Sequence, residues 1–270
     1  MGRFDFYWIW PPFAKLIKKK NAMTSLSEDC SIELVVARHE EDLRWLKRVP
    51  ASFRISVYDK GVTQALPESL IGREGMSVVT LLNTGREAHT YLTHLITRFD
   101  SLADVTVFCQ GHPFDHAPDM HERLKALAER KEIPSPFLWY GFLEDTDDPQ
   151  GRRLFVPWSK NPERVELSTG SLYELIFGGP SPDLFHFRGG AQFAVSREGA
   201  RSRSLEFYER ALEACLSDAL APHSLERFWD RFFGGPVIDP ETLGHDGTRY
   251  LKKIRRLEPG GEIIGAVDSV

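Results

Sequence analysis

Short apolar runs alternate with amphipathic stretches through the middle of the chain. The runs are rich in β-branched residues and are bounded by polar residues, which predicts strands at 32–37, 53–58, 104–109 and 191–195. In other stretches apolar residues recur every three or four positions, which predicts helices at 88–99, 119–131, 205–216 and 224–233. Strands that alternate with helices indicate an α/β fold, with a single mostly parallel sheet flanked by helices.

The chain is predicted to have three parts. Residues 1–30 form an N-terminal arm that ends in a polar linker, residues 31–233 form the α/β domain, and residues 234–270 form a C-terminal tail. Within the domain, residues 133–182 are irregular and rich in proline, glycine and aromatic residues. Loops of this length in a compact domain usually bind or cover a ligand.

Composition narrows the classes of partner. The 270 residues carry a formal net charge of -5, so the chain lacks the overall basic field typical of nucleic-acid binders. We therefore expect no nucleic acid partner. Cys30, Cys109 and Cys215 are too few and too far apart for a disulfide framework or a zinc motif.

The N-terminal arm contains no predicted membrane span. Its apolar stretch at residues 4–9 is interrupted by Pro11 and Pro12, and a span needs about 20 apolar residues. The basic cluster follows the apolar stretch, whereas a signal peptide places it first. We therefore expect a soluble, cytoplasmic protein. Trp8 and Trp10 near several lysines also suit weak contact with a membrane surface, although a loosely docked arm is the simpler interpretation.

The first candidate residues follow the first two strands. Ligands of parallel sheets bind beyond the carboxyl ends of the strands. Arg38 and Asp42 follow the first predicted strand, and Asp59 follows the second. A solvated charged turn would explain the same residues.

A helix start at residues 83–87 is the second candidate. Thr84 and Glu87 have the spacing of a capping box. Free backbone amides, the helix dipole and the guanidinium of Arg86 suit a phosphate, with Asn83 beside them. An ordinary capped helix is the alternative interpretation.

The third candidate is the loop that follows the strand at 104–109. His112, Asp115 and His116 combine imidazole and carboxylate, which are ligands of divalent transition metals. Asp115 is also a candidate catalytic residue. Alternatively, Asp115 and His116 cap the next helix and His112 is solvated.

Four segments resemble a family that is defined only by a domain of unknown function. These segments read VVARHEEDL (35–43), NTGREAHTYL (83–92), VFCQGHPFDH (107–116) and GAQFAVSR (190–197). Their layout also resembles the A-type glycosyltransferase fold. This resemblance implies a nucleotide-activated sugar as donor, a small-molecule or glycan substrate as acceptor, and a divalent metal, Mn²⁺ or Mg²⁺, as cofactor.

The glycosyltransferase resemblance also implies roles for individual residues. The nucleotide would lie near Arg38, Asp42, Asp59, Asn83 and Arg86. Gln110 would face the diphosphate, Gln192 would lie on the acceptor side, and Glu226 would be the catalytic base. Where the resemblance implies an Asp-x-Asp metal motif, this chain has Gln110-Gly111-His112.

This departure leaves three functional hypotheses open. The first is a glycosyltransferase-like enzyme that transfers a sugar from a nucleotide-activated donor to an acceptor. The second is a non-catalytic binding protein on the same fold. The third is a metal-dependent tailoring enzyme that uses His112, Asp115 and His116.

Overall fold

The computed structural model describes residues 30–61, 66–152, 166–243 and 247–252, together with the backbone of residues 254–257 and 263–267. The predicted N-terminal arm, up to residue 29, lies outside the described residues, as does the membrane contact considered for Trp8 and Trp10. Within the described part of the chain, no helix combines the length and the apolar character needed to cross a membrane.

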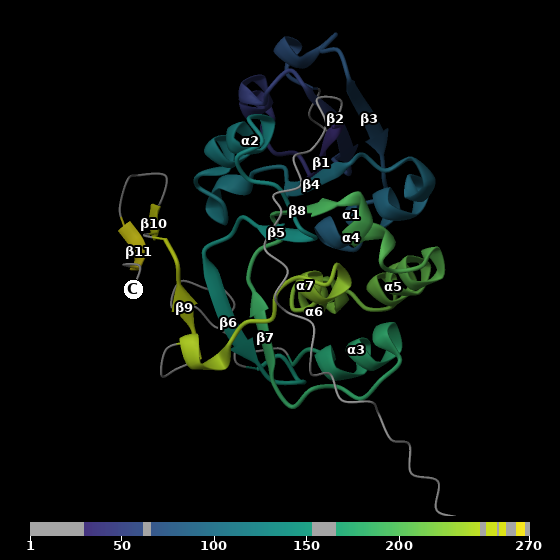
Figure 1. Ribbon diagram of the computed structural model, residues 1–270, viewed down its shortest axis with the longest axis vertical. Helices are drawn as coiled ribbons and strands as arrows, with labels where there is room; N and C mark the ends of the chain where they lie inside the picture. The colour runs from purple at the N-terminus through teal and green to yellow at the C-terminus, as the bar shows by residue number, and fades with distance from the viewer. Residues whose placement is uncertain are drawn as a thin grey trace, which may run out of the picture.

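A six-stranded sheet with the order β3-β2-β1-β4-β8-β5 forms the centre of the molecule (Figure 1). Its strands are β1 (Ile32–Arg38), β2 (Phe53–Asp59), β3 (Met76–Thr80), β4 (Val105–Gln110), β5 (Phe137–Trp139) and β8 (Phe193–Ser196). The first four strands are parallel, and β8 is antiparallel to both β4 and β5. Only β8 therefore runs against the others, which confirms the predicted mostly parallel sheet.

Helices cover both faces of this sheet, and the central strands are therefore buried on both sides. On one face, α1 (Arg86–Thr97) and α5 (Leu205–Ser217) pack side by side. Tyr91 and Leu95 of α1 lie in the aromatic core of that face, one helical turn apart. On the other face, α2 (Met120–Ala128) buries Met120, Leu124 and Leu127 against β1 and β4.

Smaller elements extend this core. A three-stranded antiparallel sheet has the order β7-β6-β9 and comprises β7 (Phe185–Arg188), β6 (Leu143–Asp147) and β9 (Arg249–Tyr250). A separate antiparallel pair comprises β10 (Ile254–Leu257) and β11 (Ile263–Val267). In Figure 1, β6 and β7 lie below the large sheet, with the short helices α3, α6 and α7.

The remaining helices are short. The α-helices are α3 (Thr169–Phe177), α4 (Arg197–Arg201), α6 (Ala221–Leu225) and α7 (Trp229–Phe232). The 3-10 turns are η1 (Arg44–Arg48), η2 (Glu68–Leu70), η3 (Phe99–Ser101), η4 (Pro113–Asp115) and η5 (Pro240–Thr242). The single helix predicted at 224–233 is therefore wrong, because α6 ends at Leu225 and α7 begins at Trp229. Between them the backbone tightens, and the amides of Arg227 and Phe228 bond to carbonyls three residues earlier.

Candidate functional site

Arg38 and Asp59 form an ion pair at the carboxyl ends of β1 and β2. The two residues are partners in the parallel register, and Arg38 Nη1 donates to Asp59 Oδ2 at 2.5 Å. Arg38 is only 2% exposed, and its Nε donates to the carbonyl of Glu41. The other carboxylate oxygen of Asp59 accepts the amide of Gly61 at 3.0 Å. A carboxylate oxygen has two lone pairs, so Asp59 can still accept a ligand hydroxyl.

Two other predicted residues lie in the loops beside this pair. Asn83 Nδ2 and His39 Nε2 are 2.9 Å apart, which connects the loop after β1 with the segment before α1. Asp42 lies on the exposed side of its loop and pairs with Arg44 at 2.5 Å. The hydrogen bonds from the Arg44 backbone and side chain lower the pKa of Asp42. Asn83 therefore contacts the loop that follows Arg38. Asp42 is paired with Arg44 on the exposed side of that loop.

The start of α1 adopts an unusual backbone conformation. Gly85 and Arg86 have φ values of 62° and 46°, so two consecutive residues are left-handed. A side chain at Gly85 would collide with α1 and α5, because its Cβ would lie 2.7 Å from the Cβ of His89 and 3.1 Å from Sγ of Cys215. Glycine adopts a left-handed conformation without strain, but Arg86 carries a Cβ. For a residue with a Cβ this conformation costs about 1–2 kcal/mol. Strain of this kind is concentrated at functional sites.

The predicted capping box at this helix start is wrong. The N-cap is Gly85 and not Thr84, and no side chain caps the helix. The left-handed turn delays the helix by one residue, so Thr84 is out of position. The side chain of Arg86 remains 55% exposed, with its Nε 3.7 Å from the carboxylate of Glu87. It is therefore available to a ligand.

Lys60 lies directly beneath this turn. The residue is 5% exposed, and its Nζ donates to the carbonyl of Thr84 at 2.7 Å and to the carbonyl of Arg86. Burial lowers the pKa of Lys60 to about 8. The sequence pattern indicated only a turn here. The available signal was a lysine that follows a buried strand at the ligand-binding edge of a parallel sheet.

Gln110 and Gln192 join β4 to the start of β8. Gln192 Nε2 donates to Gln110 Oε1 at 3.1 Å, and Gln192 is completely buried. The Oε1 atom of Gln192 is buried and accepts no hydrogen bond from the described residues. Because its oxygen is held by Gln192, Gln110 has its amide nitrogen left to donate to a ligand oxygen.

The structure does not assemble the predicted metal site. His112 and Asp115 are exposed, with Nε2 and Oδ1 4.0 Å apart, and Asp115 is 68% exposed. His116 instead lies against Gly190, where an added Cβ would be 3.1 Å from the Cβ of His116. The 3-10 turn η4 thus leaves His116 at Gly190, while His112 and Asp115 face solvent. Asp115 and His116 do not cap α2 either, because its N-cap is Asp119.

No group of three or more His, Cys, Asp or Glu side chains within the described ranges could hold a metal ion. The described residues therefore do not offer a site that would hold Mn²⁺ or Mg²⁺ through three protein ligands. Asp115 is mostly exposed to solvent, with His112 as its ion-pair neighbour. The metal and catalytic roles of this loop remain predictions.

The backbone of Gly190 holds Glu226 at the edge of the sheet where β4 ends and β8 begins. Its Oε1 accepts the Gly190 amide at 2.5 Å, and its side chain remains 21% exposed. Gly190 has φ 85°, a conformation that favours glycine. Its neighbours are fixed, since Tyr91 donates to the carbonyl of Ala191 at 2.8 Å. The predicted residues His116 and Glu226 therefore meet at one rigid glycine turn.

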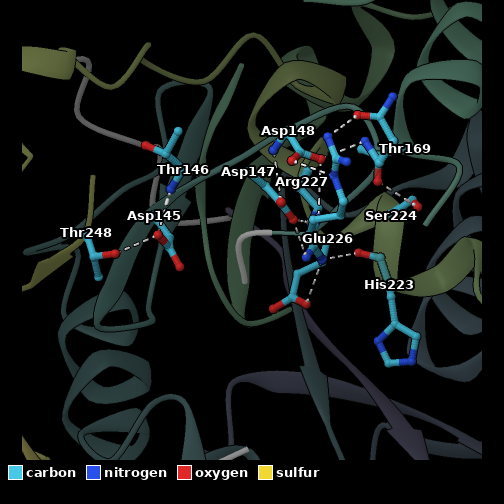
Figure 2. A network of polar contacts seen from close by, with 12 residues as sticks. Asp145, Thr146, Asp147, Asp148, Thr169, His223, Ser224, Glu226, Arg227 and Thr248 are labelled. Atoms are coloured by element: carbon cyan, nitrogen blue, oxygen red, sulfur yellow. Dashed lines mark hydrogen bonds and ion pairs between the residues drawn. The ribbon is translucent and has the colours of Figure 1, made fainter. Parts of the chain in front are cut away.

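A buried ion pair lies behind Glu226 (Figure 2). Arg227 donates to Asp147 Oδ2 through Nε at 3.1 Å and through Nη2 at 2.8 Å, and both side chains are almost completely buried. Arg227 Nη1 also donates to the carbonyl of His223 at 2.5 Å. In Figure 2 the side chains of Glu226 and His223 extend away from Asp147. The ion pair thus anchors the backbone that carries both residues.

His223 lies in α6, which packs against α1 and is followed directly by Glu226. Burial is the largest cause that lowers the pKa of His223, followed by the nearby charge of Arg86. Glu226 is close enough to oppose this shift. The sequence pattern did not identify His223. The available signal was a histidine three residues before the candidate base, next to a proline.

Several solved structures are similar to the chain. They include a CMP:2-keto-3-deoxy-manno-octonic acid synthetase in complex with CTP, with 11% identity, a TM-score of 0.32, and coverage of 75% of this chain and 87% of that chain. Glucosyl-3-phosphoglycerate synthase from Mycobacterium tuberculosis, in complex with Mn²⁺, UDP and glucosyl-3-phosphoglycerate, has 12% identity and a TM-score of 0.32, with 77% and 82% covered. Mannose-1-phosphate geranyltransferase from Thermus thermophilus has 15% identity and a TM-score of 0.28, with 77% and 69% covered.

A comparison with curated protein sequences gave no match. A family match, however, covers residues 34–242, which include the large sheet except the first two residues of β1, and every candidate residue discussed above. The chain therefore belongs to the family described as a protein of unknown function, DUF3431.

Proposed function

We propose that this chain is a glycosyltransferase-like enzyme that transfers a sugar from a nucleotide-activated donor to an acceptor hydroxyl. One observation carries this proposal. The helix α6, which bears His223 and is followed directly by Glu226, packs against α1, which begins at Arg86, so a cation and a carboxylate lie near each other at one edge of the sheet. A sugar transfer needs a base for the acceptor and a cation for the departing diphosphate.

The nucleotide would bind beside the Arg38–Asp59 pair. It closes the carboxyl ends of two neighbouring parallel strands, the usual ligand position in such sheets. Asp59 is held from two sides, by Arg38 and by the Gly61 amide, and is therefore preorganised. Its remaining lone pairs would accept a hydroxyl of the ribose or an N–H group of the base.

The diphosphate would lie at the start of α1. The exposed guanidinium of Arg86 provides a planar donor that matches phosphate oxygens. The amide nitrogen of Gln110 would donate a further hydrogen bond. These groups supply positive charge and hydrogen-bond donors from the protein itself.

The reaction would use Glu226 as base. Its carboxylate takes the proton from the acceptor hydroxyl, whose oxygen attacks the anomeric carbon of the sugar with its electron pair. The bond between that carbon and the diphosphate oxygen breaks, and the diphosphate leaves with the bonding electrons. Arg86 then stabilises the negative charge that develops on the leaving group.

Ligand-dependent thermal stability tests this proposal. We would measure unfolding with a panel of nucleoside diphosphates and nucleotide sugars, since a ligand at 100 times its dissociation constant adds about 2.7 kcal/mol. Asp59→Asn and Arg86→Gln should each remove the stabilisation. Arg54→Gln is the matched control, because Arg54 is the second residue of β2, at the opposite edge of the sheet, and its side chain is half exposed.

The outcomes separate the hypotheses. Stabilisation by one nucleotide sugar, lost in Asp59→Asn and kept in Arg54→Gln, supports the proposal. Stabilisation without any turnover of the nucleotide sugar would favour a non-catalytic binding protein. No stabilisation by any nucleotide or nucleotide sugar would contradict the proposed donor.

A further inference from the structure

Lys60 is placed in a way that the fold alone does not require. Its ammonium is almost completely buried and donates to two backbone carbonyls, those of Thr84 and Arg86. An isolated buried charge destabilises a protein, because carbonyl dipoles replace the lost hydration incompletely. The lowered pKa of Lys60, about 8, has burial as its largest cause.

The two carbonyls flank the strained turn. Thr84 precedes the left-handed Gly85, and Arg86 is itself left-handed. Lys60 therefore bridges the two ends of this turn on its buried side, while the side chain of Arg86 stays exposed. A costly buried charge and a strained backbone at the same place indicate that the turn is held in this conformation for a ligand.

We propose that Lys60 is a positioning residue that holds the Gly85–Arg86 turn for an anionic ligand, and that binding of a nucleoside diphosphate there draws a proton onto Lys60. This inference rests on the proposed function, since it concerns the diphosphate part of that site. Binding of the proton to Lys60 and binding of the anion are thermodynamically linked. Protonation of Lys60 raises the affinity for the anion, and bound anion raises the proton affinity of Lys60 by the same factor.

The charged and titratable groups around Lys60 leave room for this coupling. From α1, Glu87 favours the charged lysine and Arg86 opposes it. His89, also on α1, has its pKa lowered by burial and by Lys60, so it stays neutral near pH 8. From α5, Cys215 has its pKa raised to about 12 and is a neutral thiol. The effects of Glu87 and Arg86 on the protonation of Lys60 thus oppose each other. An added anion would favour the protonated form of Lys60.

Calorimetric titration with UDP at pH 7, 8 and 9 tests the inference, because its phosphates are fully ionised at the higher pH values. Repeating the pH 8 titration in two buffers of different ionisation enthalpy gives the number of protons taken up. For a coupling of about tenfold, Lys60 would change from half to about nine-tenths protonated on binding, an uptake of about 0.4 proton. The affinity of the wild type for UDP should fall about fivefold from pH 7 to pH 9.

Two variants and one control sharpen the test. Lys60→Met should bind UDP more weakly, take up no proton at pH 8 and lose the pH dependence. Lys60→Arg keeps a charge that does not titrate, so it should keep part of the affinity and also lose the pH dependence. Lys125→Met, at a lysine that is 73% exposed, should behave like the wild type.

The wild-type titration alone can overturn the inference, even if a variant fails to fold. UDP binding without proton uptake at pH 8, and with equal affinity at pH 7 and 9, would overturn the role of Lys60 and leave the proposed function standing. No binding of UDP or of any other nucleoside diphosphate would instead overturn the proposed donor site, and the inference with it.

Discussion

The guanidinium of Arg227 lies 2.8 Å from the carboxylate of Asp147, and this buried pair connects β6 with the segment that carries Glu226. The ring of Phe187 lies 4.9 Å from the guanidinium and shields it further. Two residues 80 positions apart in the chain thus fix the backbone behind the candidate base. The pair has consequences for stability that can be measured.

Asp147→Asn should destabilise the fold strongly. Removing one partner of a buried ion pair leaves the other charge uncompensated, which typically lowers the free energy of unfolding by 3–5 kcal/mol, and the amide keeps part of the hydrogen bonding, so we expect about 3 kcal/mol. Urea denaturation measures this change. Asp148→Asn is the control at the next residue, because Asp148 pairs with the half-exposed Arg152 and should cost less than about 1 kcal/mol. Equal effects of the two substitutions would contradict the importance of the buried pair.

Gly190→Ala should reduce both stability and function. Alanine pays the cost of φ 85°, about 1 kcal/mol, and its Cβ would also press on His116 at 3.1 Å. Gly178→Ala is the matched control, since Gly178 has φ 74° with nothing within 4 Å of an added Cβ. Chemical denaturation of both variants separates the backbone cost from the crowding. If Gly190→Ala destabilises no more than Gly178→Ala, the contact with His116 does not constrain the turn.

Lys60 should make stability depend on pH above neutrality. Its folded pKa of about 8 lies below its unfolded value of 10.5. Between these values the unfolded chain holds a proton that the folded chain has released, so the contribution of Lys60 to stability rises with pH across this window. Below pH 8 both states are protonated, and the full cost of the buried charge is present.

Urea denaturation of wild type and Lys60→Met between pH 7.5 and 9.5 measures this contribution. The difference in free energy of unfolding between the two proteins should change with pH, with a slope below the limit of about 1.4 kcal/mol per pH unit for one proton. Lys125→Met should keep the wild-type slope. A difference that is constant from pH 7.5 to 9.5 would show that Lys60 does not titrate in this window.

The sequence could predict the parallel strands because their signal is local. The strands predicted at 32–37, 53–58 and 104–109 match β1, β2 and β4 within one residue at each end. Strands of a parallel sheet are buried on both faces, so they read as continuous apolar runs. Their order then placed Arg38, Asp59 and Gln110 at one edge, where the structure also has them.

The remaining features depend on partners that are distant in the sequence. β6 reads Leu-Glu-Asp-Thr-Asp, which is not an apolar pattern. Two of its buried acids pair with arginines 80 and 105 residues away, Asp147 with Arg227 and Glu144 with Arg249. Lys60 similarly resembles a solvated turn residue until the carbonyls of the α1 start are placed above it. Buried polar residues are defined by what they pair with, and a single sequence does not give that pairing.

Glu226→Gln should separate chemistry from binding. Glutamine keeps an oxygen that can accept the Gly190 amide, so the local geometry and nucleotide binding should be retained. The amide cannot take a proton from the acceptor, and loss of a general base typically lowers the rate by 10²–10⁴-fold. Sugar transfer is measured once a donor has been found by its thermal stabilisation, with Glu213→Gln as the control at an exposed glutamate of α5. A Glu226→Gln variant with the wild-type rate would assign the base to another group, and His223, within electrostatic reach of Glu226 and kept neutral by burial and by Arg86, would be the next residue to substitute.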